Sequence, residues 1–474
     1  MTTPPPALDA VGAAIDRGLH QLAALGGDLV EHANRIGTIL WSPPRIVVVG
    51  RIKGGKSTLV NALIGAPVAD TGALETTNVV TVYQYGAPAR ADAVALDGTR
   101  RTLPVDRNRP AGLDPATVAE IAYVHRYLPS RAIADLTLVD TPGLATLTEA
   151  NENATRRVLI DGFEQTRTAS VDADAAVFLF DAAPRADEVD FLRQIGFTPL
   201  NTLGVLSRAD GFGAGVLGDV DPITHAHSHA RTLADRLSDA VMTVVPIAGL
   251  LAETSHTGQL TENDARALAT LGGIDPLDLI EILEADDPAP LTPQMRDRLL
   301  DLIGEYGVVG GRDAATGGAH RLGAWLTERS GIDVLRTVLH DSIREFASIH
   351  RAYRILTDID NLAYQHPAGD HIRTVAHTIR LDPAITPVLL FRSLRGMLEA
   401  DPRSPVVDRL IQVLRGRTPA ERVGLPTGAP TGDIADAIHH HLGWVHQQAI
   451  ATMSAAEDAA LADLLAAYNL MLPR

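Results

Sequence analysis

One short segment constrains the fold of this chain more than any other: Arg45 to Thr58, which reads RIVVVGRIKGGKST. Its first residues form a β-branched run that is typical of a buried strand. Gly50, Gly55, Lys56 and Ser57 then match the spacing G-x-x-x-x-G-K-[ST]. In this motif the glycines let backbone N–H groups turn towards phosphates, while the lysine reaches the β- and γ-phosphates. The segment therefore predicts a strand, a phosphate-binding loop and a helix.

The residues around the loop support this interpretation. Lys53 and Lys56 are the only lysines in a chain of 474 residues, which otherwise uses arginine for positive charge. A compact ammonium group suits a phosphate site. The following residues, 57 to 64, predict a helix whose N-terminus points at the anion. We expect the phosphates to be bound by Gly50, Gly54, Gly55, Lys56, Ser57 and Thr58, with the Ser57 hydroxyl as a ligand of Mg²⁺.

A second motif, Asp140-Thr141-Pro142-Gly143, directly follows the apolar run LTLV. This places D-x-x-G at the C-terminal end of a strand, where open α/β sheets bind ligands. We expect Asp140 to hold Mg²⁺ through a water molecule and the Gly143 N–H to meet the γ-phosphate.

A third motif, Ser207-Arg208-Ala209-Asp210, follows an apolar strand and occupies the place of the guanine-reading motif of GTPases. The Asp210 carboxylate can accept hydrogen bonds from N1–H and the exocyclic amine of guanine, a donor pair that adenine lacks. Arg208 stands where lysine is usual, and its flat guanidinium can lie along the base. Ser207 keeps a hydroxyl. The backbone around Ala248, after the next strand, is expected to close over the guanine.

The two halves of the chain differ in pattern. Predicted strands alternate with helices in the first half, which favours a mainly parallel sheet with helices on both faces. These strands are 46–49, 79–85, 93–96, 134–139, 175–180, 203–206 and 242–245. From about residue 260 only helices are predicted, at 263–271, 276–284, 293–306, 320–329, 332–362, near 370–400 and at 433–472.

The N-terminal segment Leu8 to Leu40 predicts one long helix, because apolar residues recur in it every seven positions. Gly18 and His32 interrupt this stripe, and Pro43-Pro44 ends the helix at a predicted hinge. We expect this helix, the 332–362 helix and the last helix to pack as one bundle. An intermolecular coiled coil through the same stripe is the alternative.

Composition excludes several classes of function. The chain has no cysteine, so disulfides, thiolate metal sites and cysteine nucleophiles are absent. A net charge of −17 disfavours broad binding to nucleic acid, and no nucleic-acid partner is expected. The N-terminus lacks the pattern of a signal peptide, and no apolar run approaches the roughly 18 residues of a membrane span. We therefore expect a cytoplasmic protein that meets membranes only peripherally.

Taken together, GRIKGGKSTLVNALIG, ETTNVVTVYQYG, VDTPG and VLSRAD resemble the motifs of bacterial dynamin-like GTPases. Within that group the chain is most similar to the mycobacterial isoniazid-inducible type, through segments such as FTPLNTLGVLSRAD and LTERSGIDVLRTVL. The resemblance implies an α/β plus all-α fold, in which a P-loop GTPase domain joins a helical neck and trunk built from both chain ends. The expected limits are 1–42 for the neck helix, 43–320 for the GTPase domain and 321–474 for the neck and trunk.

The resemblance also implies an activity and its partners. We expect Mg²⁺-dependent hydrolysis of GTP to GDP, stimulated by pairing with a second G domain of a like or related chain. We expect this activity to drive remodelling of membrane lipids at the inner face of the cell membrane. The switch threonine that reaches Mg²⁺ falls at Thr77, with Thr76 as the near alternative. Ser57, Thr77 and Asp140 are thus the predicted metal site.

Two positions depart from the family pattern. Ile52 stands where the best-known eukaryotic members have a glutamine, and an isoleucine cannot orient water. Lys53 follows it, and its ammonium is a candidate for neutralising charge that develops between the β- and γ-phosphates. Arg208 is the second departure. The predicted catalytic residues are therefore Lys56, Thr77, Lys53 and Gly143.

Other features have two interpretations each. A regulatory GTPase switch that recruits a protein without touching lipid is the alternative function, and an ATPase is a third. The segment 388–391 is either a membrane-inserting tip or helix core, and 181–188 is either a contact with a partner G domain or a plain surface loop. Two histidine groups are either metal ligands or solvated clusters: His225, His227 and His229, and His439 to His441.

Overall fold

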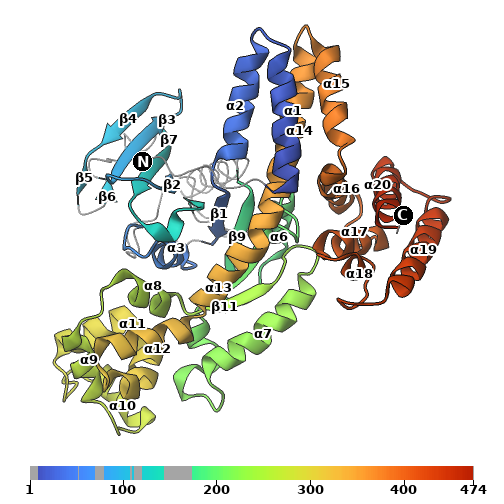
Figure 1. The fold of residues 1–474 in the computed structure, drawn as a ribbon. Helices are drawn as coiled ribbons and strands as arrows, with labels where there is room; N and C mark the ends of the chain where they lie inside the picture. Colours follow the sequence, from blue (N-terminus) through green and yellow to red (C-terminus); the bar gives the residue numbers. More distant parts are fainter. Residues whose placement is uncertain are drawn as a thin grey trace, which may run out of the picture. The chain divides into compact units, whose positions relative to one another are not determined.

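A computed structural model describes residues 9–51, 53–69, 79–106, 109–110, 120–142 and 173–472. The chain divides into two compact units, shown in Figure 1. We call the first the sheet unit, which comprises residues 45–191 and 202–342. We call the second the helical unit, which comprises residues 1–44, 192–201 and 343–474. Each is described by itself below.

A nine-stranded sheet forms the centre of the sheet unit, in the order β11-β10-β9-β1-β8-β2-β7-β3-β4. Its strands are β1 (Arg45–Gly50), β2 (Val80–Tyr85), β3 (Arg90–Ala95), β4 (Arg100–Leu103), β7 (Ile121–Leu128), β8 (Thr137–Asp140), β9 (Ala175–Phe180), β10 (Thr202–Ser207) and β11 (Val244–Ile247). The short strands β5 (Val105–Asp106) and β6 (Arg109–Pro110) form a separate antiparallel pair.

The sheet is mainly parallel, as predicted. Five of its eight neighbouring pairs are parallel, namely β11–β10, β10–β9, β9–β1, β1–β8 and β2–β7. The pairs β8–β2, β7–β3 and β3–β4 are antiparallel. Since β1, β8, β10 and β11 run in one direction, their carboxyl ends lie at one edge of the sheet. The predictions missed β7, whose apolar alternation is interrupted by His125 and Arg126.

Helices surround the sheet and continue beyond it. They are α3 (Lys56–Ile64), α6 (Ala186–Gln194), α7 (Pro222–Arg236), α8 (Gly249–Thr257), α9 (Glu262–Ala269), α10 (Pro276–Glu284), α11 (Pro293–Ala315), α12 (Gly318–Ser330) and α13 (Ile332–Val338). The last residues of α6, from Leu192, group with the helical unit. Helices α12 and α13 belong to the sheet unit.

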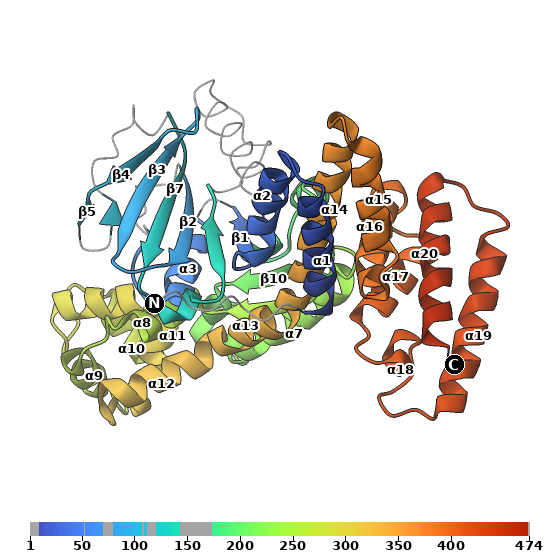
Figure 2. The ribbon, with the colours of Figure 1, turned by 45° about the horizontal axis from the view of Figure 1, so that its top comes forward.

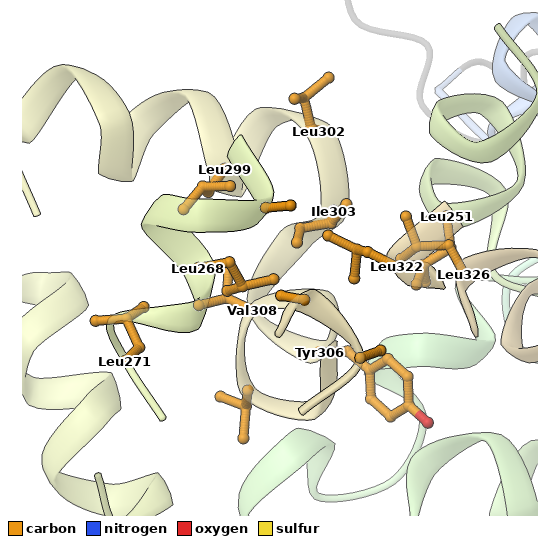
Figure 3. Close-up of a cluster of buried hydrophobic side chains, with 14 of the residues drawn as sticks. Leu251, Leu268, Leu271, Leu299, Leu302, Ile303, Tyr306, Val308, Leu322 and Leu326 are labelled. Carbon is orange, nitrogen blue, oxygen red and sulfur yellow. The ribbon is translucent and has the colours of Figure 1, made fainter. Parts of the chain in front are cut away.

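Helices α8 to α12 share a hydrophobic core of their own, drawn in Figure 3. Its fully buried members include Leu251, Leu268, Leu299, Ile303 and Leu322. Burying side chains of this size contributes roughly 1.5–3 kcal/mol each. This core holds the segment after β11 against α11 and α12.

The helical unit contains α1 (Ala10–Ala24), α2 (Leu29–Trp41), α14 (Arg344–Gln365), α15 (Gly369–Arg380), α16 (Thr386–Ala400), α17 (Pro405–Arg415), α18 (Pro419–Arg422), α19 (Thr431–Gln448) and α20 (Ala455–Met471). A π-helical turn at Leu339–Ile343 separates α13 from α14, so the predicted 332–362 helix is interrupted. In the described ranges, no helix is both long and apolar enough to cross a membrane.

The prediction of one N-terminal helix is wrong. The segment is a hairpin of α1 and α2, because Gly26 and Gly27 adopt φ values of 77° and 65° that end α1. Gly18 and His32, which interrupt the apolar stripe, lie within α1 and α2 and do not end either helix. The Gly26-Gly27 pair indicates the end of a helix, but the heptad pattern continues on both sides of it and favoured one long helix.

The predicted packing of the chain ends needs a second correction. The last helix is two helices, α19 and α20, and α20 packs on α16, α17 and α19. The N-terminal hairpin packs on α14, as predicted, and on α15, whereas the last helices do not join this group; Figures 1 and 2 show the two groups at separate ends of the helical unit. Ile15, Leu22 and Ile36 of the stripe are fully buried within the chain, so the stripe is not free for a coiled coil. In the segment 388–391, Val388, Leu390 and Phe391 likewise belong to the buried face of α16, and Leu389 is half-buried.

Candidate nucleotide-binding site

The phosphate-binding loop lies between β1 and α3, as predicted. A Cβ atom on Gly50 would come within 2.5 Å of the Leu179 carbonyl oxygen on β9, so only glycine fits beside that strand. Gly55 caps α3 with φ 92°, a left-handed conformation that favours glycine. Gly54 approaches the Arg51 carbonyl closely, with 3.1 Å from a Cβ to the oxygen. Lys53 is non-glycine yet has φ 59°, which is uncommon and marks a constrained turn.

Lys56 closes this loop on itself. Its ammonium donates to the carbonyl oxygens of Gly50 at 3.1 Å and Arg51 at 2.7 Å. Burial lowers the pKa of Lys56 to about 8, while the charge of Asp140 opposes the shift. A buried ammonium whose only partners in the described residues are neutral carbonyls is suited to gain a phosphate oxygen as a stronger partner.

Asp140 ends β8, next to β1 in the sheet. Its side chain is 1% exposed, and neither carboxylate oxygen has a well-formed hydrogen bond from a described residue. Burial raises the pKa of Asp140 to about 6, moderated by the charge of Lys56 and the nearby Ser57 hydroxyl. Two buried, unpartnered carboxylate oxygens beside a hydroxyl fit a hard divalent cation.

The described residues hold no group of three or more histidine, aspartate or glutamate side chains that could bind a metal alone. This agrees with the usual Mg²⁺ site of such loops, which uses one or two protein ligands and completes the shell with phosphates and water. Ser57 and Asp140 are therefore the residues of the described ranges that fit the predicted cation.

The third motif lies at the end of β10 and carries two constraints. Arg208 has φ 55°, and its Nη2 donates to the Lys53 carbonyl oxygen at 2.9 Å, which ties this motif to the phosphate loop. Ser207 Oγ donates to the Phe180 carbonyl oxygen at 3.2 Å. Burial raises the pKa of Asp210, and the charge of Arg208 works in the opposite direction. Arg208 thus links the third motif to the phosphate loop.

Ala248 lies between β11 and α8, where it was predicted to meet the base. Its N–H donates to the Ser330 carbonyl oxygen at 3.0 Å, at the end of α12. The next residue, Gly249, faces Thr58 of α3, whose Cγ2 would lie 3.5 Å from a Cβ on the glycine. The segment after β11 is therefore held against the helix that starts at the phosphate loop.

The predicted residues Thr77, with its alternative Thr76, and Gly143 lie outside the described residues, as does Ile52. The structure does describe how the chain enters the first of these segments. The buried Asn61 side chain accepts N–H groups of Val68 and Ala69 at 2.8 and 2.6 Å. Arg126, 3% exposed, donates to the Val68 carbonyl oxygen at 2.6 Å. Asn61 and Arg126 therefore fix residues 68 and 69.

Sequence reasoning missed both of these anchors. Asn61 lies in the NALIG run directly after the phosphate loop, close in sequence to the residues that it binds. The hydrogen-bond partner of Arg126, Val68, is 58 residues away in the chain, so no local pattern indicates the contact. A polar residue inside an apolar strand was the one available signal.

Neither earlier interpretation of residues 181–188 describes Glu188. Its side chain is 5% exposed and accepts two hydrogen bonds from the guanidinium of Arg51, at 2.6 Å from Nε and 3.1 Å from Nη2. Glu188 also accepts the Arg185 N–H at 2.8 Å. The ion pair between Arg51, the second residue of the phosphate loop, and Glu188 thus holds the loop against α6.

Within the described ranges, neither histidine group forms a cluster of three or more side chains that could hold a metal ion. His225 and His229 lie against the Phe212 ring, at centroid distances of 5.1 and 4.9 Å. His441 stacks on Tyr468 at 5.1 Å. These histidines pack against aromatic rings.

Comparison with known proteins agrees with the site. Residues 46–206 match the model of the dynamin family. The chain is 30% identical to the isoniazid-induced protein IniC of Mycobacterium tuberculosis over 451 residues, 87% of each chain. It is 32% identical to the isoniazid-induced protein IniA of the same organism over 183 residues, 35% of this chain and 26% of IniA. The solved structure of an oligomerised bacterial dynamin pair covers 98% of this chain and 75% of its own, with 12% identity and a TM-score of 0.35.

The match to IniC extends over most of both chains at an identity that shows a shared family. It therefore includes the helical segments as well as the nucleotide site. The chain belongs to the bacterial dynamin-like proteins, as a member of the IniC type.

Proposed function

We propose that this protein binds GTP with Mg²⁺ and hydrolyses it to GDP and phosphate. One observation carries the proposal: Lys56, Asp140 and Asp210 follow three parallel strands of one sheet, at the same edge. The first residue suits phosphate, the second a cation and the third guanine. Chains that bind a nucleotide at such a loop use the same division of labour.

The reaction needs no covalent intermediate with the protein. Water attacks the γ-phosphorus, the bond to the β–γ bridging oxygen breaks, and GDP leaves with inorganic phosphate. Lys56 and the loop N–H groups stabilise the charge on the phosphate oxygens. Mg²⁺, when bound, supplies further neutralisation of that charge, and Ser57, Asp140 and the predicted Thr77 would hold it. The Gly143 N–H is assigned to the γ-phosphate.

Lys53 is assigned to the charge that develops between the β- and γ-phosphates. Its exposed position in the loop and its constrained backbone support this role. Lys53→Ala should slow single-turnover hydrolysis at saturating GTP while the affinity for GDP changes little. An unchanged single-turnover rate would remove Lys53 from the mechanism.

The hydrolysis proposal is tested by phosphate release from GTP and ATP, with Mg²⁺ or with excess chelator. We expect release from GTP alone, dependent on Mg²⁺ and lost in Lys56→Ala. Equal turnover of both nucleotides, or full activity of the Lys56 variant, would contradict the proposal.

We further propose that two G domains pair, with a second copy or a related chain, and that pairing drives the helical parts to remodel membranes peripherally. In this proposal the G domain spans 43–320, and segments 1–42 and 321–474 form the neck and trunk. The family membership supports it. The second candidate is a regulatory switch that recruits a protein and never binds lipid. The buried state of residues 388–391 favours this candidate, because it removes the one apolar tip that the sequence suggested.

Liposome co-sedimentation separates the two candidates when turnover is measured at several protein concentrations. Turnover per molecule that rises with concentration, together with GTP-sensitive pelleting, is expected for a membrane-remodelling dynamin. Turnover independent of concentration and no pelleting with any lipid would favour the switch.

A further inference from the structure

Helix α11 contains a single break, at Gly304. Its φ of 59° and ψ of 179° lie within an otherwise continuous helix from Pro293 to Ala315. This combination of angles is accessible essentially to glycine alone. A conformation of this kind persists only where the surroundings hold it, and such residues cluster at functional sites.

The break lies beside the base-reading carboxylate. A Cβ atom on Gly304 would lie 3.9 Å from Asp210 Oδ2 and 3.6 Å from Cδ2 of Leu250. Asp210 belongs to the motif after β10, whereas Leu250 follows the segment after β11. The turn at Gly304 therefore lies where the two predicted base-contacting segments approach one another.

Hydrogen bonds hold the chain on both sides of the break. Two residues before it, the Leu302 carbonyl oxygen accepts a hydrogen bond from the buried Thr254 hydroxyl of α8. Two residues after it, the Tyr306 hydroxyl donates to Asp221 Oδ1 at 2.9 Å. In Figure 3, Ile303 and Tyr306 come from the two sides of the break, and the Tyr306 hydroxyl points away from the hydrophobic cluster.

Asp221 is itself fixed, because it caps α7 by accepting the Thr224 N–H at 3.1 Å. The turn is thus anchored to α8 on one side and to α7 on the other. It cannot move away from Asp210 without breaking one of these contacts.

We propose that the Gly304 turn is a positioning element for guanine recognition. The turn brings backbone without a side chain beside Oδ2 of Asp210, and its anchored position restricts the space in which the carboxylate, whose terminal torsion is otherwise broad, can rotate. Both oxygens are then held where they accept from N1–H and the exocyclic amine. This inference rests on the proposed guanine-binding role of Asp210.

The test is the ratio of GDP affinity to IDP affinity, measured by calorimetry on the full chain. Inosine keeps N1–H and lacks the exocyclic amine, so this ratio reports the second hydrogen bond to Asp210. The wild-type protein should bind GDP roughly ten-fold or more tightly than IDP, as expected for one charge-assisted hydrogen bond. Gly304→Ala should lower the ratio several-fold. A purely structural role would lower both affinities equally and leave the ratio unchanged.

Two further variants complete the test. Gly323→Ala lies in α12 of the same helical cluster, where a Cβ meets nothing within 4 Å, and should keep the wild-type ratio. Tyr306→Phe removes only the bond to Asp221 and should give an intermediate ratio, even where Gly304→Ala does not fold. An unchanged ratio in folded Gly304→Ala, or in Tyr306→Phe if the glycine variant is unfolded, overturns the inference. Failure of the wild-type protein to bind GDP overturns the proposed function itself.

Discussion

At the scale of single residues, the site buries two opposite charges whose mutual attraction does not offset the cost of their burial. Asp140 and Lys56 are both buried, and burial moves their pKa values towards neutrality, to about 6 and about 8. Each group is more easily charged in the unfolded chain, so each lowers stability at neutral pH. A nucleotide and its cation would supply the missing partners. The cost of burying Asp140 and Lys56 thus lowers the stability of the nucleotide-free chain at the proposed binding site.

The Asp140 carboxyl gives this statement a testable pH dependence. Its pKa is raised from 3.8 to about 6, so between these values the unfolded chain loses a proton that the folded chain keeps. Stability therefore falls as pH rises through this window and stays lowered above it. Relative to Asp140→Asn, the nucleotide-free wild-type protein should lose on the order of 1–3 kcal/mol between pH 4 and 6, as measured by thermal unfolding.

Asp264 provides a control of opposite sign. Burial alone would raise the pKa of Asp264, but hydrogen bonds from Arg298 and Thr261 lower it overall. Relative to Asp264→Asn, wild-type stability should thus fall as pH drops below the usual range of a carboxyl group. If both variants shifted the pH profile in the same direction, the assigned environment of Asp140 would be wrong.

At the scale of elements, the phosphate loop is anchored to α6 by an ion pair between the half-buried Arg51 and the buried Glu188. Arg51→Ala should destabilise the protein by about 3 kcal/mol, because it leaves the Glu188 charge buried without its partner. Adding Glu188→Gln to that variant should recover much of the loss, which denaturant unfolding can measure. Arg373→Ala, which removes the exposed pair with Asp370, should leave the midpoint nearly unchanged. No recovery in the double variant would mean that Arg51 acts through packing alone.

The N-terminal hairpin gives a prediction about helix packing. A Cβ on Gly18 of α1 would come within 2.3 Å of two side-chain atoms of Ile379, which is 3% exposed on α15. Gly18→Ala should therefore destabilise the protein by about 1–3 kcal/mol through overpacking. In Gly443→Ala, a Cβ meets nothing within 4 Å. This change should raise the free energy of unfolding by roughly 0.5–1 kcal/mol through helix propensity. A Gly18 variant as stable as wild type would contradict this packing.

Some strands and helices could be predicted from the sequence and others could not. Strands β1, β8, β9, β10 and β11 were predicted because each contains a short, largely apolar run, and three of them end in a recognisable motif. Strand β7 was missed because His125 and Arg126 lie inside it. The hairpin of α1 and α2 was missed because the apolar heptads continue on both sides of Gly26-Gly27. Contacts such as Arg51 to Glu188, 137 residues apart, follow from the topology and leave no local pattern.

At the scale of the whole molecule, the first of the four points where the chain passes between the two units falls between Pro44 and Arg45, directly before β1. This is where the sequence predicted a hinge, and the hinge role stays a prediction. Replacing Pro43 and Pro44 by alanine should change GTP-dependent liposome pelleting more than GTP affinity. The matched replacement of Pro426 and Pro430, in an exposed loop of the helical unit, should change neither. A change in affinity alone would argue against a hinge.

In the proposed nucleotide site, one acid selects guanine for a phosphate-binding loop more than 150 residues before it in the chain. Calorimetric titration of GDP, ADP and XDP into wild-type protein and Asp210→Asn measures this selection. The wild-type protein should bind GDP at least ~100-fold more tightly than ADP, because two charge-assisted hydrogen bonds are at stake. The variant should lose GDP binding and gain XDP, since an asparagine amide can donate to the carbonyl that xanthine carries in place of the amine. Equal affinities for GDP and ADP in the wild-type protein, together with no change in the variant, would contradict the account.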